Sequence, residues 1–463
     1  MTSSEQTTHE VEIDNSNRST TPTTGSFIDY ISSHWADRPE TVPGPLPVVR
    51  YAAERRAAIG AQFPGQRLVF SAGAMKQRSN DTFYQYRPHS AFAHLTGWGS
   101  DAEPGSVLVL DPRESGASHE ATLYFRERAG RDSEEFYANP EIGEFWIGER
   151  PSLAQVAGLL GIRTAPLAEF AELPDDRTLE DPELARAASE LRLVKDEFEL
   201  AEMRAAVDAT GRGFAEVLAA LPRATEVRRG ERVVEGVFNA RARLDGNTVG
   251  YETIAAAGPH ACTLHWIRND GDVLPGDLLL LDAGIEMDSL YTADITRTVP
   301  VSGRFTAAQR RVYEAVLEAA DAARAIVKPG IRFGDVHDAA MAVIERRTRE
   351  WGLLPEADGT AYYRRYMVHG TSHHLGMDVH DCAQARREMY LDGILEPGMV
   401  FTIEPGLYFQ PDDLTVPEEL RGIGVRIEDD IVVTADGCEN LSAGIPRTAD
   451  EVEDWVQAAR GDA

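Results

Sequence analysis

The sequence has little cysteine, no long apolar run and too few basic residues to balance its acids. Its three cysteines, Cys262, Cys382 and Cys438, lie far apart and form no CxxC pair, so we expect a reducing, cytoplasmic setting. No window approaches the roughly 20 apolar residues of a membrane helix, so we expect a soluble protein without a membrane partner. The formal net charge of −30 disfavours a nucleic-acid partner, because phosphate binding needs clustered Lys and Arg.

The length of 463 residues predicts two domains after a short tail. Residues 1–26 are polar and acidic without an apolar core, which is typical of a disordered tail and of neither a signal peptide nor a transit peptide. Residues 27–181 mix short apolar runs such as "SVLVLDP" with a helical stretch at "SLAQVAGLLG", so we expect a small α/β domain. Residues 182–463 combine strand-like segments with helical patterns at about 307–327 and 333–351. The predicted fold class is therefore mixed α/β (α+β).

Several carboxylates stand where strands should bury apolar side chains. In "LLLLDAGIEMDSLYTADITRT", Asp282 ends one apolar run and Asp294 lies inside another. Glu404 directly precedes a Pro-Gly turn in "FTIEPG", and Glu428 lies in the strand-like "GVRIEDDIVVT". One such residue would most simply be a surface carboxylate on a half-exposed strand. Four of them need a shared counter-charge, because burying an unpaired carboxylate is costly, and divalent metal ions would supply it.

Histidines gather in the segment "HGTSHHLGMDVHD", which holds His369, His373, His374 and His380. Its small or flexible residues disfavour a regular helix, so we expect a loop or a strand edge. A lone histidine is most often structural, but four within one short window favour a function for at least one. Carboxylates with a single imidazole suit Mn²⁺, Co²⁺ or Fe²⁺ better than a thiolate-rich zinc site does. The residue types therefore predict a two-metal site to which Asp282 and Asp294 contribute.

In their order along the chain, "LLDAG", "ADITRT", "HGTSHHLGMDVHD", "TIEPGLY" and "GVRIEDD" resemble the signatures of the pita-bread metallopeptidases. Within that family the sequence looks most like the Xaa-Pro aminopeptidases, with the prolidases as near neighbours. The resemblance covers about residues 187–456, and the preceding domain more loosely, as at "FYQYRPHSAFAHLTGW". It implies an N-terminal mixed α/β domain followed by a C-terminal pita-bread catalytic domain.

The resemblance also implies roles for individual residues. Asp282 would bind one metal ion, His373 and Glu404 the other, and Asp294 and Glu428 would bridge the two. Glu404 would also carry a proton to the leaving amine. The residues expected to contact substrate or to orient the ligands are His265, His380, His369, Tyr408 and Arg426. His369 and Tyr408 could instead only pack, and His374 is expected to pack.

The sequence departs from the family pattern at two places. The spacing from Asp282 to Asp294 is one residue longer than is usual in the family, and His260 stands where Asn is common. An extra residue at the hairpin tip would leave both carboxylates in place, whereas a bulge within a strand would turn Asp294 away. We expect the tip, because the turn-prone residues Asp288 and Ser289 lie there.

The resemblance implies a metal-dependent exopeptidase that hydrolyses the first bond of peptides with proline at the second position. Two divalent metal ions would be its cofactors, with Mn²⁺ as the family's expectation, and a homodimer or homotetramer would be its assembly. Three alternatives stay open at this point. They are a prolidase that accepts only dipeptides, a catalytically inactive pita-bread module that binds peptides or proteins, and a metal-free relative such as creatinase.

Overall fold

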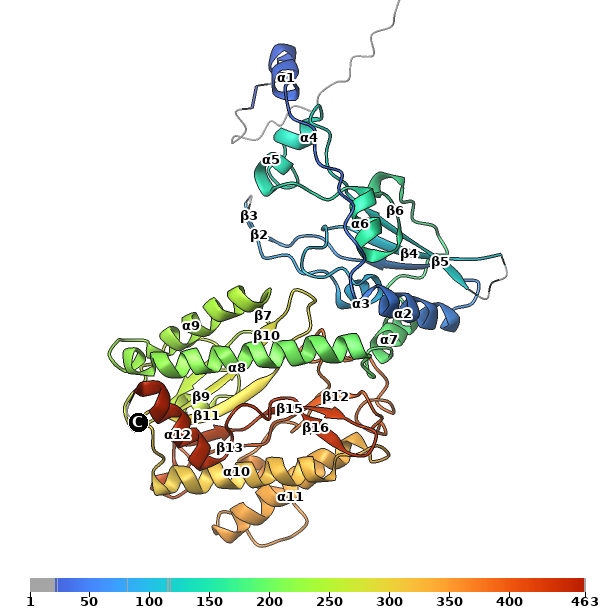
Figure 1. Cartoon of the computed structure of the whole chain (residues 1–463). Coiled ribbons are helices and arrows are strands. Elements are labelled where there is room, and N and C mark those ends of the chain that lie inside the picture. Colours follow the sequence, from blue (N-terminus) through green and yellow to red (C-terminus); the bar gives the residue numbers. More distant parts are fainter. Residues whose placement is uncertain (1–20, 23, 81, 115, 117, 462–463) are drawn as a thin grey trace, which may run out of the picture.

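The computed structural model describes residues 21–22, 24–80, 82–114, 116 and 118–461. Most of the predicted tail lies outside these residues. Its last two residues already belong to helix α1 (Gly25–Ser32). Figure 1 shows the described chain as an N-terminal part stacked on a larger C-terminal part, with the long helix α8 at the junction.

The N-terminal part is an α/β domain, as the sequence predicts, and it is built on a four-stranded sheet. Its strands follow the order β1 (Leu68–Ser71), β4 (Val107–Pro112), β5 (His119–Phe125) and β6 (Arg163–Pro166), and only the β5–β6 pair is parallel. The helices of this part are α2 (Val49–Gln62), α3 (Ser90–Thr96), α4 (Glu134–Tyr137), α5 (Glu144–Ile147) and α6 (Leu153–Leu160), and a small hairpin joins β2 (Gln77–Ser79) to β3 (Thr82–Phe83).

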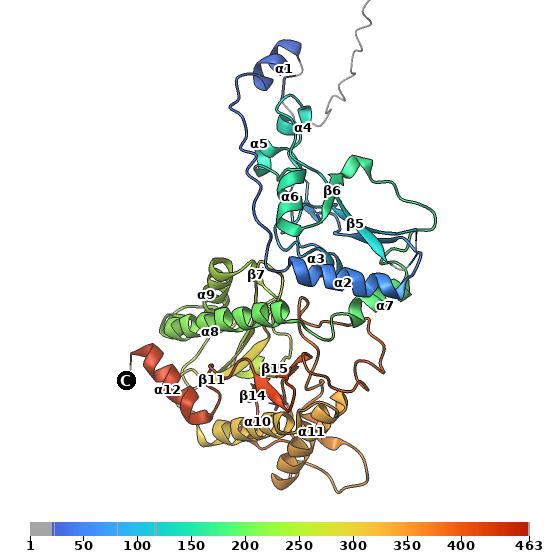
Figure 2. The same cartoon turned by 45° about the vertical axis from the view of Figure 1, so that its right-hand side comes forward.

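The C-terminal part places small antiparallel sheets between two pairs of helices. Helices α8 (Glu197–Thr225) and α9 (Gly230–Asp245) cover the side toward the N-terminal part, while α10 (Ala307–Ile326) and α11 (Phe333–Glu350) cover the opposite side (Figures 1 and 2). The predicted helices at about 307–327 and 333–351 are confirmed by α10 and α11. Helix α12 (Ala449–Arg460) packs against α8.

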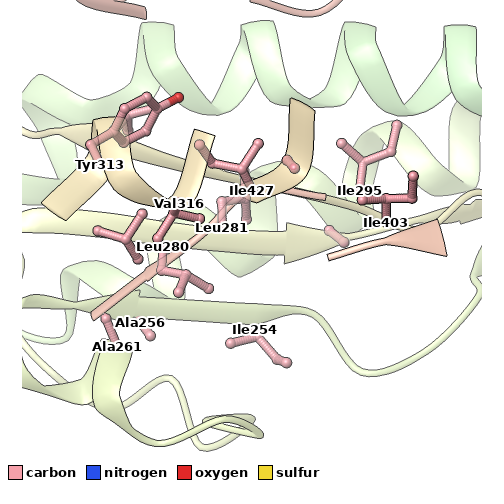
Figure 3. Close-up of a cluster of buried hydrophobic side chains, with 14 of the residues drawn as sticks. Ile254, Ala256, Ala261, Leu280, Leu281, Ile295, Tyr313, Val316, Ile403 and Ile427 are labelled. Atoms are coloured by element: carbon pink, nitrogen blue, oxygen red, sulfur yellow. The ribbon is translucent and has the colours of Figure 1, made fainter. Parts of the chain in front are cut away.

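The central sheets bring distant segments together. One sheet has the order β11 (Ile295–Pro300), β9 (Leu278–Ala283) and β8 (Ile254–Ala257), and another has the order β12 (Val400–Ile403), β15 (Asp429–Val433) and β16 (Cys438–Asn440). Two-stranded pairs join β13 (Gly406–Tyr408) to β14 (Gly424–Arg426) and β7 (Thr248–Val249) to β10 (Ile285–Glu286). Figure 3 shows part of their shared core, in which side chains of β8, β9 and β11 cluster with Tyr313 and Val316 of α10.

The sequence predicts one strand at "GVRIEDDIVVT", and this prediction is wrong. The structure divides it into β14 and β15, which pair with β13 and β12. The partner segment breaks at Glu404–Pro405, where proline has no N–H to donate to a ladder. The Ile427 N–H bonds the Pro405 carbonyl at 3.3 Å across this break. Glu404 and Glu428 therefore both lie in the gap between two ladders rather than within a regular strand.

Helix α7 (Pro182–Glu190) joins the two parts. Its buried residues Leu184, Ala187 and Ala188 pack in the hydrophobic cluster of the N-terminal part, although they follow the domain boundary predicted after residue 181. That boundary stays a prediction. All three cysteines are free. In the part of the chain that the structure describes, no helix is long and apolar enough to cross a membrane.

Candidate metal centre

The β9–β11 hairpin carries Asp282 and Asp294. Within the paired strands Thr296 lies opposite Asp282, and the same register continues to a bridge between Glu286 and Thr292 and to the bond from Met287 N–H to the Tyr291 carbonyl. The described hairpin therefore has no bulge between the carboxylates and its tip at residues 288–290. The prediction that the hairpin tip, and not a bulge in a strand, accommodates the extra residue between Asp282 and Asp294 is confirmed.

Tyr251 links the two aspartates and was missed from the sequence. Its hydroxyl lies 2.6 Å from Asp282 Oδ1 and 2.5 Å from Asp294 Oδ1, so it can donate its proton to either. Burial and the neighbouring carboxylates raise the pKa of Tyr251 well above its ordinary value, which keeps it a donor. Nothing in the short segment between β7 and β8 distinguishes this tyrosine from one that only packs.

His373 faces the carboxylates with one ring nitrogen. Its Nδ1 lies 3.2 Å from the His374 carbonyl oxygen, which can only accept, so Nε2 is left to face the site. Nε2 lies 3.2 Å from Asp294 Oδ2 and 3.7 Å from Glu404 Oε1. Ligand atoms of Asp294, His373 and Glu428 all lie within 4.8 Å of one another. This is the spacing of groups that could share a metal ion.

Electrostatics in the site favour a bound cation. Burial raises the pKa of Glu404 to about 7 and that of Glu428 well above its ordinary value, and the neighbouring carboxylates add to both shifts. Although burial disfavours the charged imidazole, Asp294 and Glu404 raise the pKa of His373 to about 9. Carboxylate oxygens with one imidazole nitrogen form a donor set that fits divalent ions, which would relieve this mutual repulsion.

Arg426 supports the cluster from one side. It donates a short hydrogen bond to Asp282 Oδ2, and it contacts Tyr408 OH at 3.0 Å and Thr296 Oγ1 at 3.1 Å. Thr296 in turn donates to Glu428 Oε2 at 2.6 Å. The guanidinium therefore fixes Asp282 directly and Glu428 through Thr296.

His369 continues this chain of hydrogen bonds. Its Nδ1 must donate to the Gly370 carbonyl at 2.6 Å, which leaves Nε2 to accept from Tyr408 OH at 2.8 Å. Burial and the nearby Arg426 cation lower the pKa of His369 to about 3, so the ring is neutral. The tyrosine thus joins Arg426 to a histidine whose Nδ1 is 3.5 Å from Glu404.

The predicted site residues meet at one cavity of about 590 Å³. Its lining includes every predicted site residue except Tyr408, which lies behind Arg426 and His369: Asp282, Asp294, His373, Glu404, Glu428, His265, His369, His380 and Arg426. The rings of His380 and His373 are 4.3 Å apart. The apolar lining comes from Ile254, Leu264, Ile267 and Val379.

Two histidines near the site have structural contacts instead. His374 is buried and stacks on Phe333 with ring centres 4.7 Å apart, which confirms that it packs. His260 bonds the fully buried Glu231 at 2.8 Å and stacks on Trp266, which bonds the same carboxylate at 2.8 Å. These contacts anchor the segment that carries His265.

Comparisons with known proteins identify the family of this chain. The model of "Metallopeptidase family M24" matches residues 201–435, and that of "Aminopeptidase P, N-terminal domain" matches residues 52–178. The fold and the carboxylate-rich site are those of a metal-dependent hydrolase with divalent ions as cofactors. The chain belongs to metallopeptidase family M24.

Its relatives align along almost the whole chain. Xaa-Pro aminopeptidase 1 of Streptomyces coelicolor is 50% identical over 462 residues, covering 94% of this chain and 92% of the relative. Xaa-Pro aminopeptidase of Escherichia coli is 32% identical over 444 residues, covering 89% and 98%. A solved structure of aminopeptidase P from E. coli, in a low-pH form, superposes with a TM-score of 0.75 at 30% identity, covering 89% of this chain and 98% of that one.

Proposed function

We propose that this protein is an Xaa-Pro aminopeptidase, which removes the first residue of peptides whose second residue is proline. The observation that carries this function is the cluster of Asp294, His373 and Glu428 at a cavity that also holds Asp282 and Glu404. The cluster lies in a chain that aligns almost end to end with Xaa-Pro aminopeptidases. An inactive binding module would not need this full set of donors, and neither would a metal-free relative.

The metal ions and their ligands are part of the proposal. Two divalent ions, Mn²⁺ by family resemblance, would be held by Asp282, Asp294, His373, Glu404 and Glu428. They would supply Lewis-acid chemistry at the scissile carbonyl. The pairing of Arg426 with Asp282 and of Thr296 with Glu428 would keep these carboxylates oriented, as metal ligands generally require.

The chain's own residues would then handle the proton and the substrate. Glu404 lines the cavity beside His373, where a positioned carboxylate can accept and donate a proton. The bond before proline is broken at a tertiary nitrogen that carries no hydrogen, so this leaving group must receive a proton. Glu404 would deliver it, while His265 and His380 would contact the substrate from the cavity wall and His369 would lie beside the proline ring.

The charge of the chain supports the proposed substrate and partners. The substrate's free amino terminus would enter among carboxylates, and the net charge of −30 favours such a cation over nucleic acid or an anionic membrane. A cytoplasmic homodimer or homotetramer is our proposal for its location and assembly. A prolidase would share the same ligands and would differ only in accepting no peptide longer than a dipeptide.

The test is release of the first residue from an Xaa-Pro-Xaa tripeptide and from an Xaa-Pro dipeptide. Metal-stripped protein is assayed with and without added Mn²⁺, beside Glu404→Gln as a folded control. Mn²⁺-dependent cleavage of the tripeptide supports the aminopeptidase, and cleavage of the dipeptide alone assigns a prolidase. If folded protein cleaves neither peptide with Mn²⁺, Co²⁺ or Fe²⁺, the enzyme assignment is wrong.

A further inference from the structure

Arg87 is a residue of the N-terminal part that contacts two separate active-site segments of the C-terminal part. It lies in the "YQYRPHS" stretch directly before α3, and its side chain is 33% exposed. The two segments carry different halves of the candidate metal centre. One is the hairpin with Asp282 and Asp294, and the other is the loop with His373 and His380.

The first contact reaches the hairpin. Arg87 Nε donates to Glu286 Oε2 at 2.6 Å, and the Glu286 side chain is only 3% exposed. The other carboxylate oxygen of Glu286 accepts from Asn247 Nδ2 at 2.8 Å, and Gln85 donates to Asn247 Oδ1 at 2.9 Å. Glu286 belongs to β10, between Asp282 and the hairpin tip, so the ion pair holds the hairpin from the side of the N-terminal part.

The second contact reaches the histidine loop. Arg87 Nη2 donates to the Met377 carbonyl at 2.6 Å and lies 3.4 Å from Asp378 Oδ1. Arg87 Nη1 donates to Ser90 Oγ at 3.0 Å, and the Ser90 hydroxyl donates to Asp378 at 2.5 Å. These bonds fix the loop three residues or fewer before His380.

The far side of the same loop is held by the C-terminal part. Arg192 lies 3.3 Å from Asp378 and donates to the buried Asp381 at 2.8 Å, and the buried Lys195 lies 3.4 Å from Asp381. His380 therefore stands between two anchored aspartates. Of these side-chain anchors, Arg87 is the one that also bonds the hairpin, and the two segments meet directly where the Thr292 N–H bonds the Gly376 carbonyl at 3.0 Å.

We propose that Arg87 is a positioning residue for catalysis, which holds the aspartate hairpin and the histidine loop at a fixed separation. The planar guanidinium donates in two directions at once, which an ammonium group on a flexible stem does poorly. The inference rests on the proposed aminopeptidase function and adds a role to the N-terminal part within the same chain. A small misplacement of reacting groups is costly, since about 1 Å can reduce a rate about 100-fold.

The test compares Arg87→Gln with Arg67→Gln. Arg67 is a matched control, because it also makes several polar contacts, to Asp111, Asp176 and the Ala171 carbonyl, but all within the N-terminal part. On a saturating Xaa-Pro-Xaa peptide, we expect Arg87→Gln to lower kcat about 10- to 100-fold with KM changed much less. Arg67→Gln should leave kcat within about twofold of the wild type, because its contacts lie away from the catalytic groups. The kcat of Arg87→Lys should lie between those of Arg87→Gln and the wild type, because lysine keeps the positive charge but lacks the planar guanidinium that donates in two directions.

Hydrogen exchange gives a readout independent of activity. Arg87→Gln should speed amide exchange in both segments 284–293 and 377–381, while Arg67→Gln should not. Equal kcat in the two Gln variants, or unchanged exchange in either segment, would overturn the positioning role. If Arg87→Gln does not fold, kcat and hydrogen exchange are measured on Arg87→Lys and Ser90→Ala instead. An inactive wild type would contradict the proposed function, and exchange would still decide whether Arg87 joins the segments.

Discussion

Replacing Arg426 by Gln should lower the free energy of unfolding, because it breaks a buried ion pair with Asp282. Arg426 is 4% exposed and its partner Asp282 is 9% exposed, and the guanidinium also bonds Tyr408 and Thr296. Removing one partner of such a buried pair leaves the other charge without compensation, which typically costs about 3 to 5 kcal/mol. We expect a loss of about 4 kcal/mol in the free energy of unfolding of the metal-stripped C-terminal part.

The loss should depend on pH with a defined sign. Burial already raises the pKa of Asp282, and Arg426 offsets part of that rise. Without the arginine, the pKa of Asp282 in the folded protein moves further above its unfolded value. An acid whose pKa is higher in the folded state loses stability as pH rises between the two values. Arg426→Gln should therefore be more destabilising at pH 8 than at pH 5.

Urea unfolding of metal-stripped protein at both pH values measures this. The matched control is Arg204→Gln, because Arg204 pairs with Glu439 at 2.6 Å but both side chains are exposed, at 44% and 47%. Such a surface pair contributes about 1 kcal/mol or less. The double variant Asp282→Asn with Arg426→Gln should recover part of the loss. Equal losses for Arg426→Gln and Arg204→Gln, or a loss that shrinks as pH rises, would refute the reasoning.

Three further predictions concern the catalytic proton, the N-terminal part and the core. Glu404→Gln should lower kcat by about 100- to 10,000-fold in the peptide assay, with an unchanged circular dichroism spectrum, because the amide cannot carry the proton. Burial raises the pKa of Glu103 to about 7, so the charged form is penalised in the folded state. Glu103→Gln should therefore gain stability over the wild type as pH rises from 5 to 8, and a gain that falls with pH would contradict this. Leu280 is 1% exposed in the central sheet, so Leu280→Ala should lower the free energy of unfolding by about 2 to 5 kcal/mol, measured with urea. A loss under about 1 kcal/mol would mean that neighbouring side chains fill the cavity left by leucine.

A two-residue period is enough to predict which side chains of the paired strands share a face. Thr296 and Thr298 lie on the side of Asp294, where they bond Glu428 and the Arg426 backbone. Arg297 points the other way and pairs with Asp429 at 2.8 Å. These assignments needed only local geometry, because a pleated strand alternates its side chains wherever it goes.

Contacts between distant segments could not be predicted in the same way. Tyr251 joins the aspartates from a short connection that has no periodicity of its own. The division between β14 and β15 at Ile427 lies opposite Pro405 of another segment. The sequence shows the proline but does not show which segment pairs with it. Arg87 contacts residues about 200 and 290 positions away. No local pattern encodes such distances, because they follow from how the two parts pack.

The extra residue expected between Asp282 and Asp294 leaves both carboxylates lining one cavity. The register is unchanged from the paired strands to Met287 and Tyr291, so a residue added beyond them cannot rotate either carboxylate. The tip is also held from outside, since Ser100 N–H bonds the Asp288 carbonyl at 2.8 Å. A Cβ on Gly99 would lie 2.1 Å from that carbonyl oxygen, so only glycine allows this approach. The N-terminal part therefore contacts the aspartate hairpin at its tip as well as at Glu286, so residues of both parts of the chain hold the hairpin that carries Asp282 and Asp294.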